Sequence, residues 1–223
     1  MVKDTEKKIT FLVNRVNSVS SVASLTLLTI YHTGVVMKYY RKLEGERLFL
    51  APMRLEDADK FCKWFADAEI ALNLTMFDRQ MTKEREEAIL SDMVKNNSQI
   101  FGIVLNEDEQ LIGSCSLFDL DHGDRKAELG IMIGDKSCWN QGYGLEAIEL
   151  LLDYGFNILN LNNIYLKVFD YNERALRCYQ KAGFKEIGHH REARIIMGRK
   201  YDEIFMDMLA TEFCKSRLLR HLF

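Results

Sequence analysis

The segment Gln141-Gly142-Tyr143-Gly144-Leu145-Glu146-Ala147 places two glycines between a predicted strand and a predicted helix. The strand is Ala127–Ile133, and an amphipathic helix is expected from Leu145 to about Leu159. Backbone N–H groups in such a loop, with the unpaired first amides of the helix behind them, form a cradle for anionic phosphates. Glycine suits this task because a side chain would keep the backbone away from the phosphate oxygens. Two glycines at this spacing also fit a plain loop, so other parts of the sequence are needed to distinguish a plain loop from a phosphate-binding one.

Outward from this loop, the patterning predicts the element order β-α-α-β-β-β-α-β-α-β. Short polar turns join the three strands that end at Ile133, which is typical of an antiparallel meander. One right-handed β-α-β crossover follows the meander. The predicted strands lie within residues 47–53, 100–105, 111–118, 127–133, 164–169 and 201–209, and the helices begin near Leu55, Thr82, Leu145 and Asn172, the last ending at Gly183.

The same loop also matches the dinucleotide-binding pattern G-x-G-x-x-A, with Asp170 at the end of the next strand. That interpretation needs glycines directly after the strand and a series of parallel β-α-β units. Here residues 134–140 intervene, and an antiparallel meander precedes the loop. The sequence therefore disfavours a dehydrogenase.

Two blocks together resemble the motifs of the GNAT N-acetyltransferase family. Residues 141–147 resemble its acetyl-CoA signature, Q/R-x-x-G-x-G/A, with Gln141 and Gly144 in place and Glu146 where Gly or Ala is usual. Glu at that position is frequent in the branch that acetylates ribosomal proteins and spermidine. Residues 172–184 resemble the second motif, Asn-x-x-Ala-x-x-x-Tyr-x-x-x-Gly-Phe. The resemblance covers about residues 46–210 and implies an α+β GNAT fold, with a mixed, mostly antiparallel central sheet flanked by helices.

The resemblance implies transfer of an acetyl group from acetyl-CoA to a primary amine, without a metal. The acceptor is a small molecule such as a polyamine, or a protein N-terminus; an antibiotic amine and a free amino acid stay open as well. Acceptor specificity in this fold lies in the first two helices and near residues 186–202. By resemblance, the residues that contact the cofactor are Gly130, Ile131, Met132, Ile133, Gln141, Gly142, Tyr143, Gly144, Leu145, Glu146, Asn172 and Ala175.

The chemistry asks for a base and an acid, because the amine must lose a proton and the leaving thiolate gains one. Tyr179 stands where the family carries its catalytic tyrosine, so we expect it to be the general acid. Glu128 lies in an apolar strand, which motivates a role as general base; pairing with Arg125 or Lys126 is the other interpretation. A non-catalytic acyl-CoA-binding sensor or interaction protein is the alternative function, and the presence of Tyr179 argues against it.

Composition limits the remaining possibilities. A chain of 223 residues with a net charge of −3 suggests one domain with some extra length and no nucleic-acid partner. The 5 cysteines are scattered without a C-x-x-C pair, which indicates reduced thiols in a cytoplasmic protein and no zinc site. His189 and His190 have no further metal ligand at a suitable spacing. A homodimer is possible.

The two ends of the chain fall outside the family pattern. We expect residues 1–45 to be an N-terminal extension peripheral to a domain at 46–210, with 211–223 as a C-terminal tail. Residues 13–36 are apolar but interrupted by serines, threonines and His32, so they are too polar for a confident membrane span. A signal peptide or membrane anchor, and an integral helix or strand, are the alternatives for this segment. No membrane partner is expected.

Overall fold

The computed structural model describes residues 38–74, 80–95, 99–214 and 216. The predicted extension up to residue 37 and most of the predicted tail therefore lie outside the described residues. The described residues from Tyr39 onward form one compact unit. Tyr39 and Leu43 are buried in its core, and the Tyr39 hydroxyl donates to Asp57 at 2.5 Å. The stretch from residue 39 to 45 thus packs against the same core as the residues that follow the predicted boundary at residue 46.

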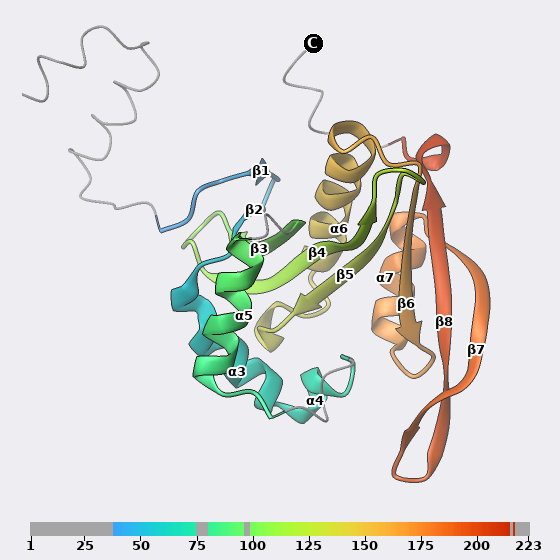
Figure 1. Ribbon diagram of the computed structural model, residues 1–223, viewed down its shortest axis with the longest axis horizontal. Helices are drawn as coiled ribbons and strands as arrows, with labels where there is room; N and C mark the ends of the chain where they lie inside the picture. Colours follow the sequence, from blue (N-terminus) through green and yellow to red (C-terminus); the bar gives the residue numbers. More distant parts are fainter. Residues whose placement is uncertain (1–37, 75–79, 96–98, 215, 217–223) are drawn as a thin grey trace, which may run out of the picture. The chain divides into compact units, whose positions relative to one another are not determined.

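Eight strands form a single sheet in the order β1-β2-β3-β4-β5-β6-β8-β7 (Figure 1). Every neighbouring pair is antiparallel except β5 and β6, which are parallel. The sheet is therefore mixed and mostly antiparallel, as predicted. The strands are β1 (Leu43–Glu44), β2 (Leu48–Pro52), β3 (Gln99–Leu105), β4 (Leu111–Asp121), β5 (Lys126–Ile133), β6 (Asn163–Phe169), β7 (Lys185–Ile196) and β8 (Arg199–Leu209).

The helices begin and end close to the predicted residues. The Thr82 hydroxyl accepts from the Arg85 amide at 3.3 Å, and the Asn172 side chain accepts from the Ala175 amide at 3.2 Å. Gly183 ends its helix in the left-handed conformation, with φ of 108°. The helices are α3 (Ala58–Ala66), α4 (Ala68–Ala71), α5 (Lys83–Lys95), α6 (Tyr143–Asp153, continued by the π-helical turn Tyr154–Ile158) and α7 (Glu173–Ala182), with short 3-10 turns at Leu55–Asp57, Lys136–Cys138 and Ala210–Glu212.

Alternating residues of β2 show how the core is divided between the two faces of the sheet. Leu48 and Leu50 belong to the cluster that contains the apolar residues of α6 and α7. Phe49 and Ala51 belong to a second cluster with residues of α3 and α5. Because successive side chains of a strand point to opposite faces, α6 and α7 cover one face of the sheet and α3 and α5 cover the other.

The strand β7 is the main element that the predicted order lacks. Most of its residues are exposed, and charged side chains interrupt it, so it has no buried apolar alternation to reveal it. It is a strand because its backbone pairs with β8 from Lys185 to Ile196. The short β1 and α4 were missed as well, since two and four residues are too few for a periodic pattern.

The strands β5 and β6 part shortly after they begin. Their pairing joins Lys126, Ala127 and Glu128 to Asn163, Ile164 and Tyr165. Beyond Glu128, β5 continues to Ile133 and pairs, among the described strands, with β4. The edge of β5 that faces β6 is therefore open from Leu129 onward, and the site lies there.

Candidate active site

A cavity of about 710 Å³ lies where β5 and β6 diverge. One side is formed by residues 128–133 of β5, residues 167–169 of β6, the glycine loop and α7. Ile70, Asn73 and Leu74 line the cavity from the segment at α4. Eleven of the predicted site residues line it: Glu128, Gly130, Ile131, Met132, Ile133, Gly142, Gly144, Leu145, Asn172, Ala175 and Tyr179.

The glycine loop leads directly into α6. Gly142 has φ of +85°, a conformation that favours glycine, and its carbonyl accepts the first helical hydrogen bond, from the Glu146 amide at 3.1 Å. The amides of residues 143–145 precede that bond, so the helix gives them no acceptor. The positive end of the α6 dipole adds to their attraction for an anion.

Gly144 tests whether this loop fits a phosphate-bearing cofactor. A Cβ at this position would meet no protein atom closer than 3.8 Å, the distance to Ile133 Cγ1. Internal packing therefore does not require glycine at position 144. The residue lines the cavity, and a side chain there would take up space in it. The loop thus fits a ligand that approaches the backbone closely, such as the pyrophosphate of CoA.

The side chains of the three remaining predicted residues, Gln141, Tyr143 and Glu146, converge on Arg47 or the preceding turn rather than on the cavity. Glu146 is buried and accepts from the Arg47 amide at 2.8 Å and from Arg47 Nε at 3.0 Å. Arg47 also donates to the Gln141 carbonyl at 2.9 Å and lies over the Tyr143 ring at 4.6 Å. The Gln141 side-chain amide donates to the Ser137 carbonyl.

Arg47 therefore fixes the glycine loop through contacts outside the cavity lining. The sequence alone did not predict this role for Arg47. The contact explains why Glu146 replaces the usual Gly or Ala of the motif: its carboxylate ties the first turn of α6 to the start of β2. The one signal in the sequence is Glu146 itself, an acid at a position where the motif usually has Gly or Ala.

Tyr179 lies on α7 and is buried, yet its residue lines the cavity. Its ring packs edge-on against Phe184 with the centroids 6.0 Å apart. Burial, and to a smaller extent Cys178, raises the pKa of Tyr179 well above that of a free tyrosine. The phenol therefore stays protonated at neutral and moderately alkaline pH, which is the state that a proton donor needs.

Glu128 pairs with a cation that neither sequence interpretation named. Lys167 of β6 donates to Glu128 Oε2 at 2.8 Å, across the point where the strands separate. Arg125 instead donates to Asn160, and Lys126 binds Asp124. The ion pair with Glu128 raises the pKa of Lys167, so the ammonium is firmly charged. The structural interpretation of Glu128 was right about a paired carboxylate and wrong about the partner.

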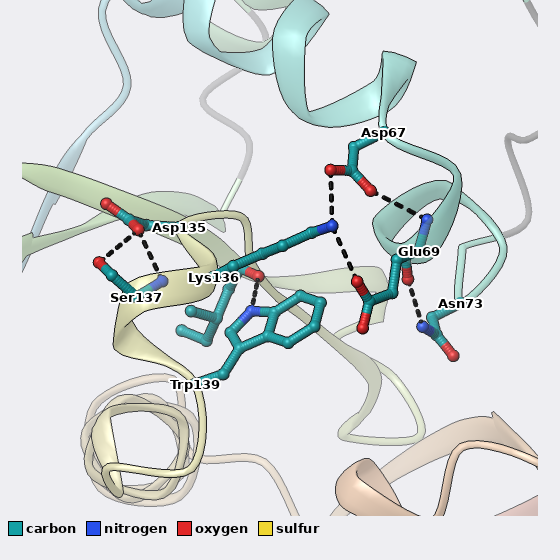
Figure 2. Close-up of polar contacts among 8 residues, drawn as sticks. Asp67, Glu69, Asn73, Asp135, Lys136, Ser137 and Trp139 are labelled. Atoms are coloured by element: carbon teal, nitrogen blue, oxygen red, sulfur yellow. Dashed lines mark hydrogen bonds and ion pairs between the residues drawn. The ribbon is translucent and has the colours of Figure 1, made fainter.

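Lys136 connects the turn before the glycine loop to the segment at α4 (Figure 2). Its ammonium lies 2.7 Å from Asp67 Oδ2 and 2.8 Å from Glu69 Oε2. Close by, the Trp139 indole donates to the Ile133 carbonyl at 2.8 Å, and the Arg174 guanidinium lies 3.5 Å from the Trp139 ring centroid. Trp139 and Arg174 both line the cavity.

Two further side chains bind the backbone that follows α4. The Tyr171 hydroxyl donates to the Leu72 carbonyl at 2.6 Å, and Arg194 of β7 donates to the Leu74 carbonyl at 2.9 Å. Tyr171 is stacked on Phe169, and Arg194 lies over the Phe169 ring at 4.6 Å. Arg194, from the region near residues 186–202, thus contacts Leu74, a cavity-lining residue in the segment between the first two predicted helices.

Comparison with known proteins identifies the family to which the chain belongs. The family model for an acetyltransferase (GNAT) domain matches residues 47–185. The chain belongs to the GNAT acetyltransferase family. It is therefore an N-acetyltransferase that uses acetyl-CoA to acetylate an amine, and the predicted GNAT fold is confirmed.

Individual relatives agree with this assignment. The "uncharacterized N-acetyltransferase p20" of Bacillus licheniformis is 32% identical over 174 residues, which cover 77% of this chain and 97% of that protein. The spermidine N(1)-acetyltransferase of Vibrio cholerae is 32% identical over 127 residues, 57% of this chain and 73% of that one. A crystal structure of a Vibrio cholerae spermidine N-acetyltransferase in complex with CoA and spermine matches with a TM-score of 0.68 and 27% identity, covering 76% of this chain and 99% of that one.

Two kinds of feature are absent from the described residues. Within them, no group of three or more His, Cys, Asp or Glu side chains is arranged to hold a metal ion. No helix in the described part of the chain combines the length and the apolar character needed to cross a membrane.

Proposed function

We propose that this chain transfers the acetyl group of acetyl-CoA to a primary amine within the cavity between β5 and β6. The proposal rests mainly on one observation. The strands β5 and β6 separate early, beside the start of α6, where Gly142 is the N-cap and Gly144 lies in the first turn. The separation opens one edge of β5, and the helix start adds unpaired amides at one end of the same cavity.

The donor half of the cavity comprises residues 129–145 and the lining residues of α7. When bound, acetyl-CoA supplies an activated acyl group as a thioester. The amides of residues 143–145 would hold its pyrophosphate, and the open edge of Gly130–Ile133 would hold the pantetheine arm and the thioester oxygen. The Asn172 side-chain oxygen already caps α7, which leaves its NH₂ group to donate to the arm beside Ala175.

Tyr179 and Glu128 supply the proton transfers. As the amine nitrogen bonds to the carbonyl carbon and the carbon–sulfur bond breaks, Tyr179 donates its proton to the departing sulfur. Glu128, directly or through water, accepts the proton that the nitrogen loses. The products are the amide and free CoA. Of the two protons that an ammonium acceptor loses, one replaces the proton that Tyr179 gave to the sulfur and the other is released from Glu128 to water, which restores both residues. Tyr179 on the cavity wall supports catalysis over a non-catalytic acyl-CoA sensor.

The five cysteines support a cytoplasmic location. All are free thiols in the structure, and Cys115 and Cys138 are buried. Reduced cysteines are the usual state in the cytosol.

A panel of amines tests the proposal. The purified chain is mixed with acetyl-CoA and, in separate reactions, an aromatic monoamine, spermidine, a free amino acid and a short peptide with a free N-terminus. We expect release of free thiol and an equal amount of N-acetylated product by mass spectrometry for at least one acceptor. Calorimetric binding of CoA without any product in this panel would favour the sensor, and binding of NAD in place of CoA would revive the dehydrogenase.

A further inference from the structure

The end of the cavity at α4 is lined in part by apolar side chains. We call residues 67–74 the acceptor wall; its Ile70, Asn73 and Leu74 line the cavity, and Phe169 of β6 lines it as well. Ile70 and Phe169 are buried, so they form fixed surfaces. An acceptor that enters here meets two aliphatic side chains and an aromatic ring.

Three side chains from distant elements fix this wall. Lys136 binds Asp67 and Glu69 at its start, and Tyr171 and Arg194 bind the backbone carbonyls of Leu72 and Leu74 at its end. In Figure 2 the Lys136 ammonium is directed between the carboxylates of Asp67 and Glu69. Lys136 thereby offsets one of the two negative charges, and neither carboxylate is among the residues that line the cavity.

The charges at this end suit one ammonium group rather than several. Among the described lining residues, the carboxylates are Glu128 and Glu203, and Lys167 is the cation beside them. Glu128 is already bonded to Lys167, at 2.8 Å. The other lining cations, Arg174, Arg177 and Lys181, all lie on α7, and Arg174 also interacts electrostatically with Glu69 of the acceptor wall. Glu128, Glu203 and Lys167 together carry a net charge of minus one, and a second ammonium of an acceptor would approach Lys167.

We propose that the acceptor is an amine with a single positive charge on an apolar group, and that Lys167 is the residue that disfavours polyamines. This inference rests on the proposed function and names the substrate class of the same cavity. Lys167 discriminates by repelling additional ammonium groups and by occupying Glu128, the carboxylate that would otherwise hold one of them.

The test compares two primary amines, phenethylamine and spermidine, in the full-length protein at one pH and ionic strength. Free-thiol release gives kcat/KM for each, and their ratio is measured in the wild type, in Lys167→Met and in the matched control Lys126→Met. Lys126 lies in an exposed ion pair with Asp124, so it tests the loss of a lysine charge away from the acceptor end. The ratio is used because any general effect of Lys167 on Glu128 acts on both amines and cancels.

We expect the wild type to favour phenethylamine by at least about tenfold, and Lys167→Met to shrink that preference by about fivefold or more, with the control unchanged. A wild-type preference for spermidine, or an unaltered ratio in Lys167→Met, would overturn the inference while leaving acetyl transfer intact. Loss of the preference in Lys126→Met as well would also overturn it, because the effect would then come from overall charge. Failure to acetylate any amine of the wider panel contradicts the proposed function instead.

Discussion

The donor half of the cavity and the acceptor wall are built in different ways. The donor half depends on backbone geometry within one short stretch, where Gly142 ends a loop and the amides of residues 143–145 begin α6. The acceptor wall depends on side chains that come from far along the chain: Lys136, Tyr171 and Arg194 reach contacts 67, 99 and 120 residues away. The backbone features of the donor half can be kept while the distant side-chain contacts change. One fold can therefore keep its donor-binding site and vary its acceptor-binding site.

The largest effect is expected in the donor half, at Tyr179. Replacing Tyr179 by Phe removes the proton donor and should lower kcat by about 100-fold or more, with little change in either KM. Calorimetry with CoA and a thermal melt of the variant are the controls for binding and folding. A fall of less than about threefold, with the chemical step shown to limit the rate, contradicts the role of general acid.

A smaller effect is expected at Glu128, which lies at the start of the divergence. Glu128→Gln keeps the shape and can still accept a hydrogen bond from Lys167, but it cannot take a proton from the amine. We expect kcat/KM for the amine to fall by about tenfold at neutral pH and by less at alkaline pH, where more of the amine is already deprotonated. Asp124→Asn, an exposed carboxylate bonded to Lys126, is the matched control. An unchanged pH profile in Glu128→Gln would contradict the role of general base and would leave Glu128 with its structural role in the ion pair with Lys167.

A still smaller effect is expected at Lys136, and it concerns the binding of the amine only. Its ion pairs with Asp67 and Glu69 are partly exposed, so they contribute little to stability and act mainly on position. Lys136→Met should raise the KM for the amine by about threefold and leave the KM for acetyl-CoA and the melting temperature nearly unchanged. Equal increases in both KM values would show that the acceptor wall and the donor half are not separate.

No effect is expected from ionisation of Tyr179 over the usual alkaline range. Because burial raises its pKa, the protonated donor form persists to higher pH than in a free tyrosine, whose pKa is about 10. As pH rises toward the pKa of the amine, which is about 10, the rate should therefore increase without a downturn. A decline in kcat beginning near pH 9, absent from Tyr179→Phe, would contradict this.

The sequence could predict the donor half because its signals are local. Gly142, Gly144 and the Asn172 cap each act within a few residues of their own position, so a motif records them. The sequence could not predict that Arg47 holds Glu146, that Lys167 takes Glu128, or that Arg194 supports Leu74, because each contact depends on how the strands are ordered in the sheet. The same reason explains β7, whose exposed residues become a strand only beside β8.

The central claim is that the glycine loop of this cavity binds CoA, and Gly144→Val tests it most directly. A side chain at position 144 meets no close protein atom and takes up space in the cavity, so the fold should persist while the ligand is blocked. Gly188→Val is the matched control, since its Cβ meets nothing within 4 Å and it lies on β7. By titration calorimetry, CoA should bind Gly144→Val at least about tenfold more weakly, a loss of about 1.4 kcal/mol, and bind Gly188→Val as it binds the wild type. Unchanged CoA affinity in a folded Gly144→Val protein would contradict the account.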